Sequence, residues 1–411
     1  AVAAEDNTPA DNPITNAGAE LGRVLFYDTR LSHNDSTSCA SCHQQSAGFS
    51  DPAPLSEGFE GELTGRKSMG LSNAKFYASG EFFWDERSPT LEHQVLQPIQ
   101  SPVEMGVTSL SDLEDKLSQT EFYPQLFQRA FGSPEVTSER MSAAMAQFVR
   151  SMVSYQSKFD QAFEGQGPPD FVGTLTASEE SGHQIFAARC DGCHRTNAQV
   201  ADDTHNIGLD LESSEEAGTD EGAGNGEFKP PSLRNVAVRG SFMHDGRFSS
   251  LEEVVQFYST GIQANPNLDD RLTNARGLPV RFNFTNQEMQ DLVAFLNSLT
   301  DESFLTNELF SNPFVVLDGD YNGDGVVDTD DYIVWRDNFG SLENLAADGN
   351  LDGVVDSADY SVWRDNLGAS WSFLADASIE AAAAPEPVAL VMLGVLLAWR
   401  TVTNRPRRRS G

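Results

Sequence analysis

The sequence has few cysteines, little positive charge and no long apolar run, and each shortage narrows the kinds of protein it can be. Four cysteines in 411 residues are too few for a disulfide-stabilised scaffold. There are 27 lysines and arginines against 62 aspartates and glutamates, a net charge of −35, and such a surface repels nucleic-acid phosphate. The apolar run at 388–399 has twelve residues, fewer than the about 20 that a membrane-spanning helix needs. A largely globular chain without a nucleic-acid partner is therefore expected.

Chain length and changes in composition predict several domains. A chain of 411 residues is too long for one ordinary hydrophobic core. A Gly/Pro-rich linker at 165–169 divides two helical segments. The small residues at 1–4 are typical of a mature N-terminus after export. We expect a first domain, a second domain, a repeat module and a tail at 1–164, 171–305, 316–372 and 383–411.

Hydrophobic spacing and capping signals predict a mainly α fold. Two capping boxes predict helix starts, one at Thr176 with Glu179 and one at Thr285 with Glu288. The acidic, Gly-rich stretch 210–230 is interpreted as a solvated loop. One helix face, interpreted as core, is predicted from the spacing of Met141, Met145, Phe148, Val149, Met152 and Tyr155.

All four cysteines fall in two Cys-x-x-Cys-His motifs. Two cysteines three positions apart can each form a thioether with a haem vinyl group, and the adjacent histidine can then bind the iron. A single Cys₄ zinc site is the alternative, but it leaves the histidine after each pair unexplained. The motifs therefore predict two covalently bound haem c groups, attached at Cys39, Cys42 and His43 and at Cys190, Cys193 and His194.

Several longer segments resemble one family. LGRVLFYDTRLS…SCASCHQQSAGFSD, FFWDERSPTLEHQVLQPIQSPVEMG and PPSLRNVAVRGSFMHDGRFSSLEEVVQFY are similar to segments of the bacterial di-haem cytochrome c peroxidases and their MauG-type relatives, over roughly residues 15–305. The resemblance implies two cytochrome c-like α domains with facing haems. It also implies that the N-terminal haem reacts with hydrogen peroxide and that the C-terminal haem stores or relays electrons.

The resemblance assigns three catalytic candidates. Glu104 in SPVEMG matches the family's acid–base glutamate, which moves a proton between the two peroxide oxygens before their bond splits. Gln94 in LEHQ matches a glutamine of the same pocket. Trp84 in FFWDER matches the aromatic side chain between the haems, where an indole can relay an electron.

The axial ligands depart from the common pattern of the family. Many members have a histidine between the first haem motif and the tryptophan, but none lies between His43 and His93 here, and His93 is interpreted as structural. The first haem is therefore predicted to be open. Fourteen residues after His244, where electron-accepting peroxidases have methionine, stands Tyr258, as in MauG-type enzymes. An anionic oxygen ligand favours oxidised iron; Met243 is the rival ligand.

The family also binds calcium between the haems, through an asparagine and backbone carbonyls. Lys67 stands where that asparagine is expected, and Ser241 replaces a usual proline. Inter-haem calcium is left open, with the Lys67 ammonium as the alternative cation.

A duplicated segment at 316–372 predicts a calcium-binding module. DGDYNGDGVVDTDDYIVWRDNFG recurs as AADGNLDGVVDSADYSVWRDNLG, 28 residues later. Each copy has the spacing of an EF-hand-like loop with aspartate at its last position, and the whole resembles a type I dockerin repeat, which binds cohesin-type partners. The predicted ligands are Asp320, Asn322, Asp324, Val326, Asp328 and Asp331 in one loop and Asp348, Asn350, Asp352, Val354, Asp356 and Asp359 in the other.

The last residues resemble a PEP-CTERM sorting tail. Pro-Glu-Pro at 385–387 precedes the apolar run and a basic end, and such a basic end is typical of retention on the cytoplasmic side before processing. A permanent membrane anchor is the alternative. We therefore expect an exported protein of the periplasm or cell envelope, associated with a membrane only through this tail.

Three functions fit the sequence. The first is peroxide reduction with electrons from a small redox protein. The second is MauG-type oxidation of a protein or other substrate through Trp84, which Tyr258 favours. The third is a non-enzymatic electron carrier, which Glu104 and the missing histidine disfavour.

Overall fold

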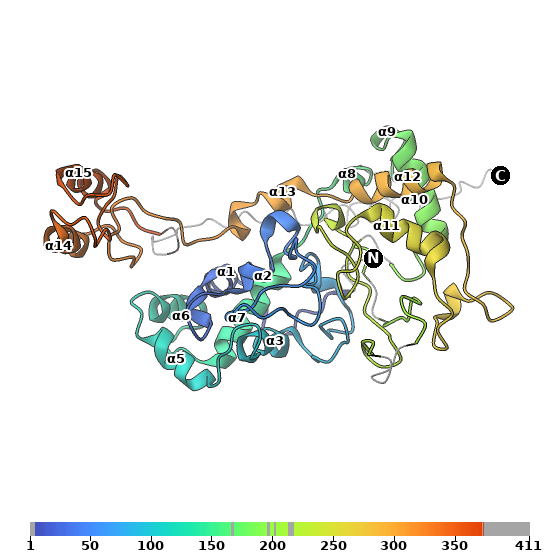
Figure 1. The fold of residues 1–411 in the computed structure, drawn as a ribbon, viewed down its shortest axis with the longest axis horizontal. Coiled ribbons are helices and arrows are strands. Elements are labelled where there is room, and N and C mark those ends of the chain that lie inside the picture. The colour runs from blue at the N-terminus through green and yellow to red at the C-terminus, as the bar shows by residue number, and fades with distance from the viewer. Residues whose placement is uncertain are drawn as a thin grey trace, which may run out of the picture. The chain divides into compact units, whose positions relative to one another are not determined.

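The computed structural model describes residues 5–165, 168–194, 198–200, 203–212, 218–371 and 373. In that part of the chain the regular structure is helical, with isolated β-bridges and no sheet (Figure 1), so the mainly α prediction is confirmed. The α-helices are α1 (Asn16–Tyr27), α2 (Cys39–Cys42), α3 (Leu91–Gln94), α4 (Gln97–Gln100), α5 (Leu110–Ser118), α6 (Tyr123–Phe131), α7 (Ser138–Ser151), α8 (Lys158–Gln161), α9 (Phe171–Thr174), α10 (Ala177–Arg189), α11 (Leu251–Gln256), α12 (Asn286–Asn297), α13 (Glu302–Leu305), α14 (Thr329–Asn338) and α15 (Ser357–Asn366). The shorter 3₁₀ segments are η2 (Thr29–Leu31), η3 (Gln45–Ala47), η4 (Ala74–Phe76), η5 (Val236–Val238), η7 (Asp270–Leu272) and η8 (Glu308–Phe310), and η6 (Phe257–Gly261) is a π-helix.

The first domain is built around the packing of α1 on α7. Gly22 allows this approach, since a Cβ at that position would lie 2.1 Å from the Ala144 carbonyl oxygen. The predicted stripe on α7 is buried from Met141 to Met152. Tyr155 is the exception, because α7 ends at Ser151 and the Tyr155 side chain is 59% exposed.

The second domain repeats this arrangement with α10 on α12. Both predicted capping boxes are present, with Thr176 accepting from the Glu179 amide and Thr285 from the Glu288 amide. Gly182 allows the close packing, because a Cβ there would lie 1.9 Å from the Asp291 carbonyl oxygen. Each domain is therefore built around one pair of helices, and a glycine in each pair allows the two helices to pack closely.

The two domains also contain the same kind of turn before a short helix, and the two turns lie 160 residues apart in the sequence. Residues 82 and 88 form a bridge before α3, and residues 242 and 248 form one before α11. Phe83 and Met243 have the same left-handed backbone, with φ of 72° and 71°. In this repeat Trp84 corresponds to His244, and Pro98 corresponds to Tyr258.

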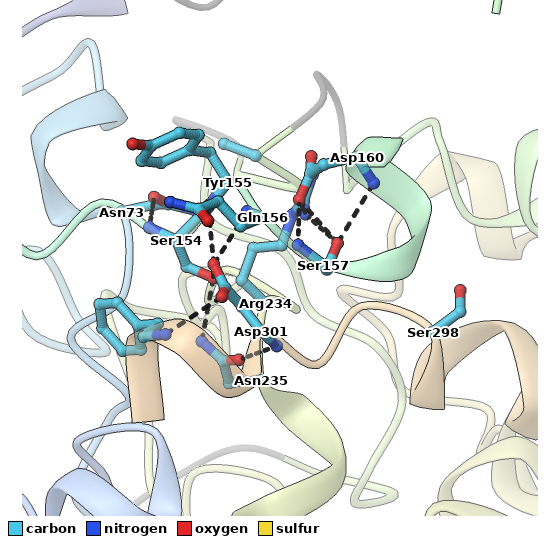
Figure 2. A network of polar contacts seen from close by, with 12 residues as sticks. Asn73, Ser154, Tyr155, Gln156, Ser157, Asp160, Arg234, Asn235, Ser298 and Asp301 are labelled. Atoms are coloured by element: carbon cyan, nitrogen blue, oxygen red, sulfur yellow. Dashed lines mark hydrogen bonds and ion pairs between the residues drawn. The ribbon is translucent and has the colours of Figure 1, made fainter. Parts of the chain in front are cut away.

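A buried polar network joins the segment after α7 to the second domain (Figure 2). The Asp301 carboxylate accepts hydrogen bonds from the Ser154 hydroxyl and from the Gln156 amide, at 3.1 and 2.9 Å. Asn235 accepts from the Asp301 amide at 2.8 Å and donates to Ser154. Burying these groups is favourable only while every member is hydrogen-bonded, so the network fixes how the two domains meet.

The chain beyond the second domain returns to the first. Phe304 packs in a cluster with Phe49 and Phe148, and the Tyr27 hydroxyl donates to the Phe310 carbonyl at 2.7 Å. The duplicated segment then forms two loops followed by α14 and α15. Contacts group Ala1–Ala375 into one compact unit.

The acidic stretch and the tail differ from the rest of the chain. The stretch 210–230 is not simply solvated, because Asp220 forms an ion pair with Arg66 of the first domain and Lys229 is buried. The tail at 383–411 lies outside the described residues. Within the part of the chain that the structure describes, no helix has both the length and the apolar character to cross a bilayer.

Candidate haem sites and the groups between them

The first Cys-x-x-Cys-His motif forms a helical turn of its own. Cys39 and Cys42 delimit α2, and the His43 amide donates to the Cys39 carbonyl at 2.9 Å. His43 Nδ1 is 2.9 Å from the Phe49 carbonyl oxygen, which holds the ring and leaves Nε2 for a metal. The turn thus presents two thiols and one oriented imidazole.

The second motif follows α10 as a turn. Cys190 is the C-cap of α10, and the His194 amide donates to its carbonyl at 3.0 Å, the same bond as in the first motif. Burial lowers the pKa of His194 to about 4, so the ring is neutral. His194 Nδ1 is buried and has no hydrogen-bond partner among the described residues. A buried, neutral imidazole that lacks a partner is suited to bind a metal.

The zinc alternative does not fit the geometry. Among the described residues, in the two motifs and in the repeat loops alike, no three or more histidine, cysteine or acidic side chains converge on one point, and a Cys₄ zinc site needs all four cysteines at one point. Burial raises the pKa of Cys39 to about 12 and that of Cys190 also to about 12, so both are protonated thiols in the free protein. The motifs act separately, as covalent haem attachment requires.

A large apolar cavity adjoins the second motif. Together with the solvent space at its mouth it encloses about 1690 Å³. Cys190, Cys193 and His194 line it, mostly among apolar side chains. A haem fits these surroundings, because the cavity supplies its two attachment sites, an axial imidazole and an apolar wall.

Both sequence-predicted sixth ligands of the second haem line this cavity. Tyr258 lies in the π-helix η6, an element often found at functional sites. Burial, and then the neighbouring Cys193 and Cys190, raise the pKa of its hydroxyl far above the ordinary value. Met243 lines the same cavity from the repeated turn. The structure therefore brings both candidates to the second motif.

Glu104 lies beside the first motif. Its turn follows α4, and its amide donates to the Ser101 hydroxyl while its carbonyl accepts from the Phe59 amide. The carboxylate is close enough to Cys39 and Cys42 to raise the pKa of both thiols, after burial itself. Burial also raises the pKa of Glu104, against the opposing effects of Ser101 and Arg87.

The neighbouring polar side chains differ in role. Gln94 ends α3, is half-buried, and makes no side-chain hydrogen bond to the described residues. His93 is exposed and its Nδ1 lies 2.8 Å from the Ser88 hydroxyl and 3.0 Å from Gln97 Nε2. Its contacts are those of a structural residue. A further histidine, His33, is an exposed side chain whose ring lies 6.0 Å from that of Phe59, and no sequence motif marks it.

Trp84 lies between the two domains and lines the cavity beside the second motif. Its indole Nε1 donates to the Lys67 carbonyl at 2.8 Å, and its own carbonyl accepts from the Lys229 amide at 2.8 Å. The Lys67 amide in turn donates to the His244 carbonyl at 2.7 Å. Lys67 therefore connects the two turns that correspond in the internal repeat.

Ion pairs across the domains hold the Trp84 turn and were not predicted from sequence. Arg66 pairs with Asp85 at 2.7 Å and with Asp220 at 2.6 Å. Lys229, 1% exposed, pairs with Glu86 at 2.6 Å. The partners are up to 154 residues apart, so only the basic and acidic residues flanking Trp84 could have suggested them.

The predicted calcium loops have the same internal bonding in both copies. Asp320 accepts from the Gly325 amide at 2.9 Å, and Asp348 accepts from the Gly353 amide at 2.8 Å. Asp331 and Asp359, each fully buried, accept from the amides of Asp328 and Asp356. The carboxylates are thus organised by backbone amides.

Comparisons with known proteins identify a haem-protein family for each of the two segments that carry a Cys-x-x-Cys-His motif. A profile described as Di-haem cytochrome c peroxidase matches residues 16–167, and one for Cytochrome c matches residues 179–300. The methylamine utilization protein MauG of Methylorubrum extorquens is 34% identical over 307 residues, covering 72% of this chain and 81% of that protein. The cytochrome c551 peroxidase of Nitrosomonas europaea is 31% identical over 292 residues, covering 69% and 80%.

A solved structure agrees as well. A MauG-like protein associated with microbial copper homeostasis has a TM-score of 0.64 at 32% identity, covering 75% of this chain and 97% of that one. The chain belongs to the di-haem cytochrome c peroxidase and MauG family, and is a peroxidase-type oxidoreductase with two covalently bound haem c groups.

Proposed function

We propose that hydrogen peroxide is reduced at the haem attached to Cys39 and Cys42, with electrons passed through the haem at Cys190 and Cys193. The position of Glu104, half-buried beside the first motif, carries this proposal. The first haem supplies the iron that polarises peroxide. Glu104 accepts the proton of one peroxide oxygen and returns it to the other, as a general acid–base group does. Gln94 is proposed to orient peroxide from α3.

The internal repeat supports an open iron at the first haem. The position that corresponds to Tyr258 is Pro98, whose side chain has no atom able to bind iron. His33 is exposed and is the alternative ligand to be tested. Tyr258 is proposed as the sixth ligand of the second haem, whose iron would displace the phenol proton that burial otherwise retains.

A MauG-type reaction is the second candidate function. Two observations favour it: Tyr258 lines the second cavity, and Trp84 is fixed at the domain boundary by contacts with both domains. In that reaction, peroxide at the first haem would drive oxidation of a protein or other substrate through Trp84. In the first candidate the electrons come instead from a small redox protein.

Haem spectra of the oxidised protein test the proposed asymmetry. We expect one high-spin and one low-spin haem, and a rapid change in the high-spin signal when peroxide is added without prior reduction. Tyr258→Phe should convert the second haem to high spin, because phenylalanine cannot bind iron. Two low-spin haems that do not react with peroxide, in the protein and in His33→Ala alike, would refute the proposal and favour the electron carrier. Unchanged spectra in Tyr258→Phe would assign the ligand to Met243.

We also propose that the repeat module binds two calcium ions and attaches the enzyme to a cohesin-type partner. The duplicated loops support the calcium sites, since each carboxylate retains lone pairs beyond its amide bonds. An aromatic groove supports the partner surface. The indoles of Trp335 and Trp363 donate to the carbonyls of Asp356 and Asp328, each reaching the other loop. The groove is lined by Thr329, Tyr332, Trp335, Phe339, Ser357, Tyr360 and Trp363.

Calcium should stabilise this module. Binding to the folded state adds about 2.7 kcal/mol per site when calcium is at 100 times its dissociation constant. Asp324→Ala together with Asp352→Ala should abolish the effect, because both remove a predicted ligand and spare the helix caps; Asp337→Ala, on an exposed side chain, is the control. Calorimetry of the full chain in calcium and in chelator gives the measurement. Equal unfolding of the module in both would contradict calcium binding.

We propose an exported location for the enzyme, with residues 383–411 as a sorting tail. The two covalently bound haem c groups and the family support export. Fractionation of cells expressing the full chain tests this, and recovery of the haem protein only from the cytoplasm would contradict it.

A further inference from the structure

Among the residues that the structure describes, no carboxylate pairs with the buried guanidinium of Arg239. Arg239 is 5% exposed, and its Nη2 donates to the carbonyls of Ser232 and Arg234, at 2.6 and 2.7 Å. Its Nε is buried and has no partner among the described residues. Burial lowers its pKa to about 10, and only the Tyr77 phenol opposes that shift. A buried charge in this state is costly unless an anion accompanies it.

Lys67 is a second buried cation in the same region. It is 4% exposed, and its ammonium donates to the Asp51 carbonyl and to the Ala53 carbonyl, the latter at 3.1 Å. Its pKa falls to about 8 because of burial, and Arg239 lowers it further while Asp51 opposes. The two cations are therefore close enough to repel each other, and the Asp51 carboxylate already accepts from the Ala53 amide.

Both cations face the second haem cavity. Lys67 and Arg239 line it together with His194. Arg239 lies near enough to lower the pKa of His194, after burial itself. Its guanidinium packs on the first domain, since a Cβ on Gly70 would be 2.8 Å from its Cζ. Two carboxylates also line the cavity, but Asp210 is paired with Arg247 and Asp220 with Arg66. The side formed by Lys67 and Arg239 is therefore positively charged.

A different cation, Arg271, lies beside the cysteines that would form the thioethers. Arg271 Nη1 lies 3.1 Å from Cys193 Sγ, and this residue is already paired with Asp269 at 3.8 Å. A haem c attached to Cys190 and Cys193 keeps two propionate carboxylates on the edge away from its thioethers. Those carboxylates are anions of the kind that a buried guanidinium needs as a partner.

We propose that Arg239, supported by Lys67, binds a propionate of the haem attached at Cys190 and Cys193. The pair forms a fixed cationic site between the two domains, made from side chains and independent of an added metal ion. It offsets part of the electron donation expected from Tyr258, because positive charge beside a haem favours the reduced iron. The inference rests on haem attachment at the second motif and not on the reaction with peroxide.

Redox titration of the intact two-haem protein tests this site. Arg239→Gln should shift the reduction equilibrium of the second haem roughly tenfold toward the oxidised form, equal to about 59 mV for one electron. Its potential should also become dependent on pH between about pH 5 and 8, because an unpaired propionate would take up a proton on reduction. Arg239→Lys retains the charge and should restore most of the potential. Arg281→Gln, on an exposed side chain, is the matched control.

Two results would overturn the proposal. One is Arg239→Gln protein that carries both haems, by pyridine haemochrome count, and has the potential and pH profile of the unsubstituted protein. The other uses the unsubstituted protein, so it holds even where the variant does not fold. Infrared difference spectra with ¹³C-labelled propionates should show ionised carboxylates at about pH 5, and protonated propionates on the second haem at that pH would exclude the ion pair.

Discussion

Replacing Glu104 with glutamine should slow the reaction with hydrogen peroxide by roughly 10²–10⁴-fold, the usual contribution of a positioned acid–base group. Glutamine has nearly the same shape but cannot accept the proton that peroxide must lose. The backbone of the turn should be unaffected, because its bonds to Ser101 and Phe59 use the amide and carbonyl of residue 104. Stopped-flow mixing of peroxide with the oxidised protein measures the rate directly.

The pH dependence of that rate separates proton transfer from a structural effect. Glu104 must be ionised to accept a proton, so the rate should fall as the pH drops through its pKa. Burial raises this pKa above its ordinary value of 4.5, although Ser101 and Arg87 oppose the shift. The acidic limb should therefore lie above pH 4.5 in the protein and be absent in Glu104→Gln.

Glu60→Gln is the matched control for this variant. Glu60 is an exposed carboxylate next to Phe59, whose amide binds the Glu104 carbonyl, so its replacement should leave rate and pH profile unchanged. Wild-type peroxide kinetics in a fully haem-loaded Glu104→Gln protein would remove Glu104 from the mechanism. Equal losses in both variants would point to the charge of the region in place of proton transfer.

The attachment chemistry was predictable because it is local in sequence. A thioether pair and its histidine lie within five residues, and the same amide-to-carbonyl bond, from His43 to Cys39 and from His194 to Cys190, closes both turns. The capping boxes at Thr176 and Thr285 were likewise readable from four residues each. In such cases the geometry follows from neighbours along the chain.

The contacts around Trp84 were not predictable, because they join distant segments. Nothing near Lys229 in the sequence indicates that its ammonium binds Glu86, 143 residues away. The internal repeat was also missed, although the sequence carries it: Phe82, Asp85 and Arg87 recur 160 residues later as Phe242, Asp245 and Arg247, around the left-handed Phe83 and Met243. The stripe ending in Tyr155 was wrong at that residue, because periodicity does not show where α7 ends.

Replacing Trp84 with phenylalanine should lower the rate of electron transfer between the haems at least about tenfold, a barrier increase of about 1.4 kcal/mol. Phenylalanine keeps an aromatic ring in the cavity wall but is harder to oxidise than indole. It also leaves the buried Lys67 carbonyl without its donor, a loss of about 1 kcal/mol in stability. The first reaction with peroxide should keep its rate, because Glu104 is untouched.

Single-turnover kinetics can separate the two steps in this variant. Peroxide-induced change at the first haem should proceed normally, whereas the response of the second haem and the oxidation of a donor should lag behind it. Glu81→Gln is the control on the same turn, because only the backbone carbonyl of Glu81 binds Lys229. If electron transfer between the haems is as fast in Trp84→Phe as in the control, then the indole has only a structural role between the domains. The MauG-type route through Trp84 would then lose its main support. A delay confined to the second haem would instead show that the ion pairs across the domains, Arg66 with Asp220 and Lys229 with Glu86, position Trp84 for electron transfer.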